Sequence, residues 1–326
     1  MGGANPTRRA LVIDTDPGVD DAIALLVAAI SPEVELVAVT TVFGNVSVPQ
    51  TTENALRILA LARAGQVPVA VGAARPLVHP QPHRAAHAHG SNGLGGVDLP
   101  LAHRAAEQTP AVRFLADLLR TAPSPVSVCA VGPLTNIALL VATDPAAAAR
   151  IERLVIMGGA FGPGNVTPTA EFNVWSDPEA AHRVFSSGLP ITMVGLDVTR
   201  PTAMDAAAVA RIGASGPVGA TAAAMLAHYL DYYVRVQGGP GVVIHDALAV
   251  LEAITPGLLG TVDRRVSVDC GHGPGRGTTL VDRRGGPGPG PDVGPLDDAA
   301  PVRVAETVDV SRAMAEIETR IRSYGH

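Results

Sequence analysis

Four aspartates, Asp14, Asp16, Asp20 and Asp21, lie within eight residues near the start of the chain, in the motif DTDPGVDD. Carboxylates this close repel one another unless a cation lies between them. Ligands that are all oxygen suit calcium or magnesium better than zinc. The motif therefore favours a cation site, although Asp20 and Asp21 could instead cap the helix expected after them.

Further polar side chains follow at other expected strand ends and helix starts. They are Asn45 in TTVFGNV, the run AVGPLTNIA at 130–138, the residues Asn165, Glu171 and Asn173 of a Gly-rich segment at 157–180, and His245 with Asp246 in VVIHDALAV. Amides and a carboxylate can hydrogen-bond several hydroxyls of a sugar. Each group also has a local interpretation, since Asn45 could be a turn residue and Asp246 a helix cap.

The elements that must position these residues alternate between apolar strands and amphipathic helices. The expected strands are 9–16, 34–44, 67–72, 125–132, 151–159, 189–195 and 302–310, and the expected helices are 20–30, 51–65, 111–122, 134–144, 177–188 and 311–323. This alternation predicts an α/β fold, with a mostly parallel central sheet flanked by helices on both faces. Ligands bind beyond the carboxyl ends of such strands, which is where Asp16 would lie.

The domain organisation is expected to be simple. Residues 1–9 would be a flexible N-terminus and residues 10–326 a single catalytic domain, because no linker interrupts the middle of the chain. Residues 72–107 form a long, histidine-containing loop, which is expected to belong to the active site. Residues 284–301 are rich in glycine and proline and predict a surface loop.

Composition excludes several function classes. All 24 basic residues are arginine, and the missing lysine excludes Schiff-base catalysis and a Walker-type phosphate loop. A net charge of −6 argues against a protein that binds the nucleic-acid backbone. The sequence has no apolar run long enough for a membrane span and no signal peptide in its first residues, so we expect a cytoplasmic protein without membrane contact.

Taken together, the motifs resemble a known family. DTDPGVDDA, HGSNGLGG, VGPLTNIA, NVTPTAEFNVWSDPEA and IHDALAV occur in the order seen in nucleoside hydrolases of the inosine/uridine-preferring type, and the resemblance extends from about residue 10 to residue 323. It implies the nucleoside hydrolase fold. It also implies hydrolysis of the N-glycosidic bond of a ribonucleoside to ribose and free base.

The resemblance further implies one Ca²⁺ in the pocket. Its protein ligands would be Asp16, Asp21, Asp246 and the main-chain carbonyl of Val131. Asp16 would act as the general base that takes a proton from water, and His245 as the general acid for the leaving base. Glycoside hydrolysis passes through an oxocarbenium-like transition state, which nearby carboxylates favour.

The family pattern also implies residues that contact the substrate. The ribose would be held by Asp20, Asn45, Asn165, Glu171 and Asn173, and Phe172 lies within this ribose-binding segment. The base would lie near His89, Tyr229 and Tyr233, although the two tyrosines, on one helical face, could instead serve ordinary helix packing. Purine-specific relatives hold the base between tryptophans, and the one tryptophan of this chain, Trp175, cannot do that alone. We therefore expect broad specificity, or specificity that leans towards pyrimidine nucleosides and inosine. By the same resemblance we expect a homodimer or homotetramer.

Two alternatives compete with this interpretation. DTDPGVDD also resembles the start of a haloacid-dehalogenase-type phosphatase, in which Asp14 or Asp16 would be the nucleophile. Such phosphatases normally use a lysine to neutralise the charge of the phosphate, and this chain has no lysine. A nucleoside-binding protein without catalysis is the second alternative, but none of the positions matched to the metal site is substituted.

Overall fold

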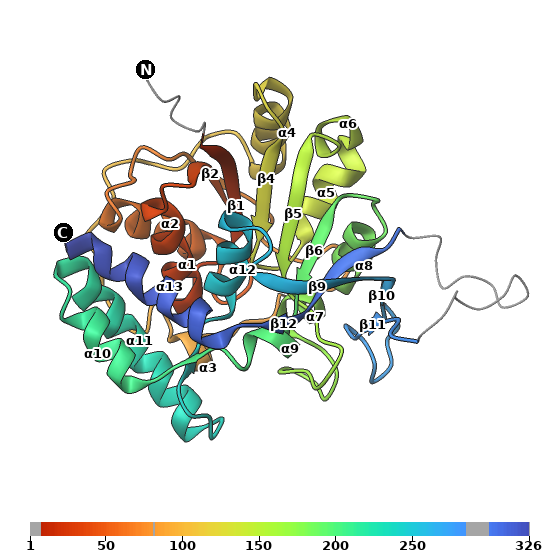
Figure 1. The fold of residues 1–326 in the computed structure, drawn as a ribbon. Helices are drawn as coiled ribbons and strands as arrows, with labels where there is room; N and C mark the ends of the chain where they lie inside the picture. Colours follow the sequence, from red (N-terminus) through yellow and green to blue (C-terminus); the bar gives the residue numbers. More distant parts are fainter. Residues whose placement is uncertain (1–7, 81, 285–299, 326) are drawn as a thin grey trace, which may run out of the picture.

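The computed structural model describes residues 8–80, 82–284 and 300–325. A single α/β domain is built around an eight-stranded sheet with the strand order β3-β2-β1-β4-β5-β6-β12-β9 (Figure 1). These strands are β1 (Arg9–Thr15), β2 (Val34–Thr41), β3 (Val69–Val71), β4 (Val126–Ala130), β5 (Ile151–Met157), β6 (Ile191–Val194), β9 (Leu259–Arg264) and β12 (Val302–Val308). Every neighbouring pair is parallel except β12 with β9 at the edge. The predicted fold class is confirmed.

The helices and the short strands complete the architecture. The helices are α1 (Val19–Ile30), α2 (Val48–Leu61), α3 (Ala86–His89), α4 (Ala111–Thr121), α5 (Thr135–Thr143), α6 (Pro145–Ala148), α7 (Phe172–Ser176), α8 (Pro178–Phe185), α9 (Leu196–Thr199), α10 (Ala206–Gly213), α11 (Pro217–Arg235), α12 (His245–Ile254) and α13 (Val310–Arg322). Two small antiparallel sheets pair β7 (Ala203–Met204) with β8 (Val242–Val243) and β10 (Val266–Val268) with β11 (Thr279–Val281).

The core consists of two apolar clusters, one on each face of the sheet. In β1, Leu11 and Ile13 pack with α1, α2, α11, α12 and α13, whereas Val12 packs with α4, α5, α6 and α8. Successive side chains of a strand point to opposite faces, so a strand with helices on both sides is buried on both faces and is mostly apolar. This is why β4, with the sequence VSVCA, is buried at every position.

Some boundaries differ from those expected. The second helix, predicted over 51–65, spans Val48–Leu61. Pro49 suits its first turn, and Arg63, with a φ of 57°, takes the left-handed conformation that ends it. The expected loop at 72–107 contains the short helix α3. Most of the predicted N-terminal segment 1–9 and of the predicted loop 284–301 lies outside the described residues.

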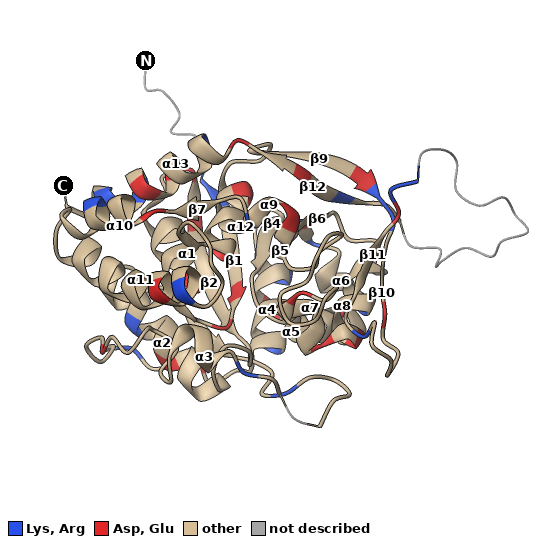
Figure 2. Cartoon of the chain, turned by 90° about the horizontal axis from the view of Figure 1, so that it is seen from below, with Lys and Arg blue, Asp and Glu red and all other residues tan. Residues whose placement is uncertain are grey.

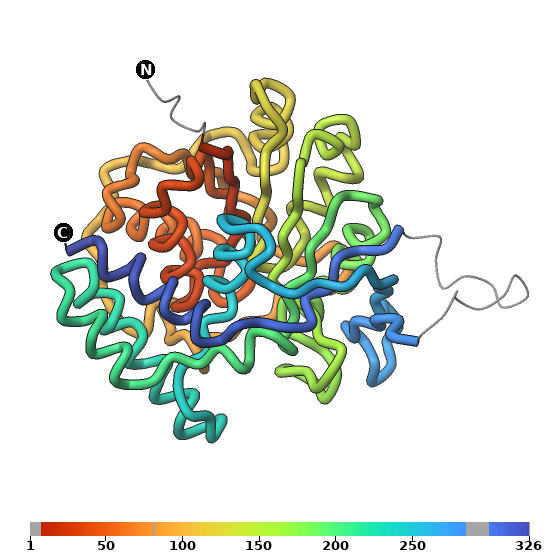
Figure 3. Tube along the Cα trace, in the orientation of Figure 1, coloured from red at the N-terminus to blue at the C-terminus, as the bar shows by residue number. Residues whose placement is uncertain are grey.

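The fold brings distant parts of the chain together at the carboxyl edge of the sheet. In the parallel register Thr15 pairs with Thr41 and Asp14 with Ala130, so β1, β2 and β4 end side by side. Helix α12 packs beside α1, as the trace in Figure 3 shows. Acidic and basic residues are interspersed over the helices and loops (Figure 2). Within the described ranges, no helix is both long and apolar enough to cross a membrane.

Candidate active site

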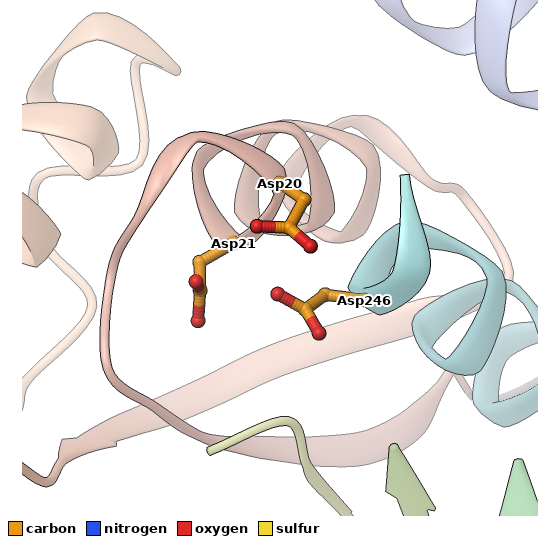
Figure 4. A group of neighbouring side chains, drawn as sticks. All are labelled: Asp20, Asp21 and Asp246. Atoms are coloured by element: carbon orange, nitrogen blue, oxygen red, sulfur yellow. The ribbon is translucent and has the colours of Figure 1, made fainter. Parts of the chain in front are cut away.

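Three buried carboxylates from two helices point toward one another (Figure 4). Asp20 and Asp21 lie in the first turn of α1, and Asp246 lies in the first turn of α12. Each offers an oxygen, and these oxygens lie within 4.8 Å of one another. The positive ends of the two helix dipoles favour negative charge here. The cluster joins residues more than two hundred positions apart in the sequence.

Asp16 lies just beyond β1 and is almost completely buried. Its Oδ2 accepts a hydrogen bond from the backbone N–H of Asn45 over 2.7 Å, while its Oδ1 has no hydrogen-bond partner among the described residues. An added Cβ at Gly44 or Gly132 would lie 1.9 Å or 2.5 Å from this carboxylate. The two glycines therefore let the ends of β2 and β4 approach Asp16.

Asp21 is held from several directions. Its carboxylate accepts hydrogen bonds from the Thr15 hydroxyl (2.5 Å), the Gly18 backbone N–H (2.8 Å) and the Asn45 side-chain amide (3.1 Å). The bond from Gly18 makes Asp21 a cap of α1, as the local interpretation of the motif expected. Asp21 is thus both a cap and a member of the carboxylate cluster. At the start of α12 the cap position is held by Ile244, which has no side-chain capping bond, and Asp246 lies in the first turn.

The electrostatics of this cluster suit a cation. Burial, followed by repulsion from neighbouring aspartates, raises the pKa of Asp16, Asp20 and Asp246 well above the ordinary range. Burial also raises the pKa of Asp21. Oδ1 of Asp16 and Oδ1 of Asp20 are buried without a hydrogen-bond partner in the described structure. Oxygen-only donors with unused lone pairs fit a hard divalent cation.

The Gly-rich segment after β5 is fixed by Glu171 and Asn173. The Asn173 side-chain amide donates to the carbonyl oxygens of Val131 (2.9 Å) and Met157 (3.1 Å), at the ends of β4 and β5. The Glu171 carboxylate caps α7 by accepting bonds from the N–H groups of Asn173 and Val174, and it also accepts one from Gly159. Both side chains are therefore held by backbone at the carboxyl edge of the sheet.

Histidines and tyrosines lie beside the carboxylates, and His89 Nδ1 is 3.8 Å from Asp20 Oδ1. His245 Nδ1 lies 2.7 Å from the Thr199 hydroxyl, and Nε2 lies 2.8 Å from the Tyr233 hydroxyl. His89 Nδ1 accepts a bond from the backbone N–H of Val19, and its ring packs 4.8 Å from that of Tyr229. Burial lowers the pKa of both histidines to about 3, so both rings are neutral near pH 7.

One cavity of about 240 Å³ is lined by both the carboxylates and the histidines and tyrosines. Among its lining residues are twelve of those predicted from the sequence: Asp20, Asn45, His89, Val131, Asn165, Glu171, Phe172, Asn173, Tyr229, Tyr233, His245 and Asp246. Asp16 and Asp21 are not in the lining and lie behind Asn45, which hydrogen-bonds to both. The structure thus brings all the predicted site residues together.

Sequence reasoning missed several residues of the site. Tyr232 and Gln237 line the cavity, and the Gln237 amide donates to the Tyr232 hydroxyl over 3.0 Å. Tyr232 had a visible signal, because it lies in the same HYLDYYVR stretch as the two predicted tyrosines. Thr199 had none, since it is 46 positions from its partner His245. Trp175 is outside the cavity lining and packs against His83, with ring centroids 3.6 Å apart.

The comparison with known families agrees with this geometry. Residues 11–315 match the family described as inosine-uridine preferring nucleoside hydrolase. The chain belongs to this family. As a nucleoside hydrolase it is a glycosidase, which hydrolyses the bond between ribose and base in ribonucleosides.

Individual nucleoside hydrolases are similar over most of their length. The chain is 42% identical to the pyrimidine-specific ribonucleoside hydrolase RihA of Salmonella agona over 83% of this chain and 88% of the relative. It is 38% identical to uridine nucleosidase 1 of Arabidopsis thaliana over 95% of this chain and 92% of the relative. Among solved structures, a purine-preferring ribonucleoside hydrolase from Gardnerella vaginalis matches with a TM-score of 0.89 and 34% identity, covering 97% of this chain and 99% of the other.

Proposed function

We propose that this nucleoside hydrolase acts in a calcium-dependent reaction, with a preference that is broad or leans towards pyrimidine nucleosides and inosine. The observation that carries the proposal is one cavity whose lining combines buried carboxylates and amides with aromatic and histidine side chains. A ribose offers hydroxyls to the carboxylates and amides, and a base offers a flat ring to the aromatic side chains.

The metal site would use Asp16, Asp21, Asp246 and the carbonyl oxygen of Val131. Asn173 takes up one lone pair of that carbonyl oxygen, which leaves the second lone pair for an ion. Asp20 is within reach of the same ion through the cluster that it forms with Asp21 and Asp246. A bound calcium ion would hold ribose hydroxyls and make the attacking water more acidic.

The residues around the ribose would stabilise the transition state. The free Oδ1 of Asp16 is the oxygen available to take a proton from the attacking water. Asp20, Asn45, Asn165, Glu171 and Asn173 would hold the ribose hydroxyls. Positive charge develops on the sugar as the glycosidic bond breaks, and the surrounding carboxylates favour that charge.

His245 would assist the departure of the base. The sequence predicts His245 as the general acid, with a pKa near neutrality. Because burial lowers that pKa to about 3, His245 would instead donate a hydrogen bond to the departing base, directly or through the Tyr233 hydroxyl. His89, Phe172, Tyr229 and Tyr233 would contact the base. The relatives named as pyrimidine-specific and as a uridine nucleosidase support a pyrimidine preference.

The remaining parts of the proposal rest on the resemblance. We infer a homodimer or homotetramer in the cytoplasm, with residues 10–326 as one catalytic domain and 72–107 as its active-site loop. Membership of the nucleoside hydrolase family leaves the phosphatase alternative without support. None of the residues matched to the metal site is substituted, so the sequence gives no support to the alternative of a non-catalytic binding protein.

A reducing-sugar assay with several nucleosides tests the proposal. Uridine and inosine should release ribose, and 2′-deoxyuridine, which lacks one ligand for the ion, should react much more slowly. The proposal fails if no ribonucleoside releases ribose. Release of phosphate from a phosphomonoester in the same preparation would then favour the phosphatase.

A further inference from the structure

Thr199 is completely buried at the end of α9, and its hydroxyl contacts the inner nitrogen of His245. The distance from Oγ1 to Nδ1 is 2.7 Å. The other ring nitrogen, Nε2, contacts the Tyr233 hydroxyl at the cavity wall. Both nitrogens of the ring are therefore occupied, and the ring plane is fixed between α9 and α11.

The neighbouring residue holds α9 against the cavity. The Arg200 guanidinium donates hydrogen bonds to the carbonyl oxygens of Pro163 and Gly164, in the segment that leads to Asn165. Thr202 donates its hydroxyl to the Thr199 carbonyl over 2.6 Å. The position of the Thr199 hydroxyl is thus determined by several contacts of the turn that carries it.

The direction of the Thr199–His245 bond follows from counting donors. A hydroxyl has one hydrogen to donate, and among the described residues Nδ1 of His245 is the one partner of the Thr199 hydroxyl. A buried O–H that donates to nothing costs more free energy than an unused acceptor lone pair. The Tyr233 hydroxyl is only part-buried at the cavity wall and can donate to solvent, whereas the completely buried Thr199 hydroxyl cannot. Thr199 therefore donates to Nδ1, and the hydrogen of the His245 ring is on Nε2.

We propose that Thr199 is a positioning residue, which sets the tautomer of His245 so that Nε2 carries the hydrogen at the cavity wall, beside the Tyr233 hydroxyl. This inference rests on the proposed function, because the departing base is what Nε2–H would stabilise, directly or through the Tyr233 hydroxyl. In the opposite tautomer Nε2 would be an acceptor, and it would repel the electron-rich base as the glycosidic bond breaks. The hydroxyl of Thr199 acts through His245 and makes no contact with the substrate itself.

The test compares Thr199→Val with Thr199→Ser. Valine keeps the shape and removes the donor, whereas serine keeps the donor. ¹⁵N–¹H correlation of the His245 ring, assigned with the help of His245→Ala, should show the Nε2–H tautomer in the wild type and in Thr199→Ser. Thr199→Val should show a mixture or the Nδ1–H form. This measurement needs no turnover, so it also tests the tautomer in a protein without nucleosidase activity.

Kinetic measurements distinguish the loss of His245 positioning from general damage to the active site. In Thr199→Val, kcat for uridine should fall about tenfold or more, with KM little changed. The rate with p-nitrophenyl riboside should stay within about twofold, since its leaving group departs without a hydrogen bond. Thr192→Val is the matched control, because the buried Thr192 hydroxyl on β6 has no hydrogen-bond partner in the described structure. It should behave as the wild type.

Two outcomes would overturn the inference. One is an unchanged Nε2–H tautomer in Thr199→Val. The other is an equal loss with uridine and with p-nitrophenyl riboside, which would indicate damage to the whole site. Failure of the wild type to release ribose from any nucleoside would instead count against the proposed function.

Discussion

The side-chain amide of Asn173 donates a hydrogen bond to the carbonyl oxygen of Val131 over 2.9 Å, across 42 positions of sequence. The same amide donates to the carbonyl of Met157. Asn173, a proposed ribose-binding residue, thus fixes the carbonyl group of Val131, a proposed metal ligand. The proposed ribose-binding residues and the proposed metal ligands are therefore linked through the hydrogen bonds of Asn173.

Asn173→Leu should weaken both the fold and the site. Two buried carbonyls would lose their donor, so the free energy of unfolding should fall by about 2 kcal/mol, and kcat/KM for uridine should fall as well. Chemical denaturation and initial rates measure the two effects. Wild-type stability and activity in this variant would show that the two hydrogen bonds from Asn173 contribute to neither property.

Asp246→Ala should abolish calcium binding and activity. It removes one of the three clustered carboxylates, and the lost transition-state stabilisation should lower kcat/KM by about 10³-fold or more. Asp263→Ala, at an exposed position on β9, is the control and should retain both properties. Isothermal titration with calcium gives the affinity. Near-normal turnover of Asp246→Ala would refute the ligand assignment.

His245→Ala should slow the reaction according to the leaving group. Hydrolysis of inosine should slow by about 10²-fold or more, whereas hydrolysis of p-nitrophenyl riboside should change little. The KM values should remain similar, because the ribose contacts are untouched. Comparable losses with the two substrates would reject a function of His245 at the leaving base.

Stabilisation by calcium should increase with pH. Burial and mutual repulsion raise the folded-state pKa of Asp16, Asp20 and Asp246 above the unfolded values, so ionising them costs folding free energy. The metal-free protein should therefore lose stability as pH rises above about 4. Calcium favours the ionised carboxylates and offsets this loss. The Tm gain from calcium should be larger at about pH 8 than at about pH 5, and the reverse order would contradict the account.

Much of the fold could be predicted because its signals are local. Apolar runs such as the one in β4 need no tertiary information, and neither does the crowding of Asp16, Asp20 and Asp21 in one motif. Helix ends are harder to predict. Helix α2 ends just before Arg63, which takes a left-handed conformation that usually marks a glycine, so the sequence gives no sign of the end there.

The part of the site that escaped prediction depends on contacts between distant segments. Thr199 becomes important only because α9 packs against the start of α12 and brings its hydroxyl to His245. Gln237 lines the cavity from the segment just after the end of α11. Nothing in the local sequence distinguishes this threonine or this glutamine from others on the surface or in the core.

The most direct test of the central claim is ribose release from uridine before and after removal of calcium. The account predicts that the untreated protein releases ribose, that thorough chelation followed by removal of the chelator abolishes release, and that added calcium restores it. Ribose release that continues unchanged in the calcium-free protein would contradict the proposed metal site.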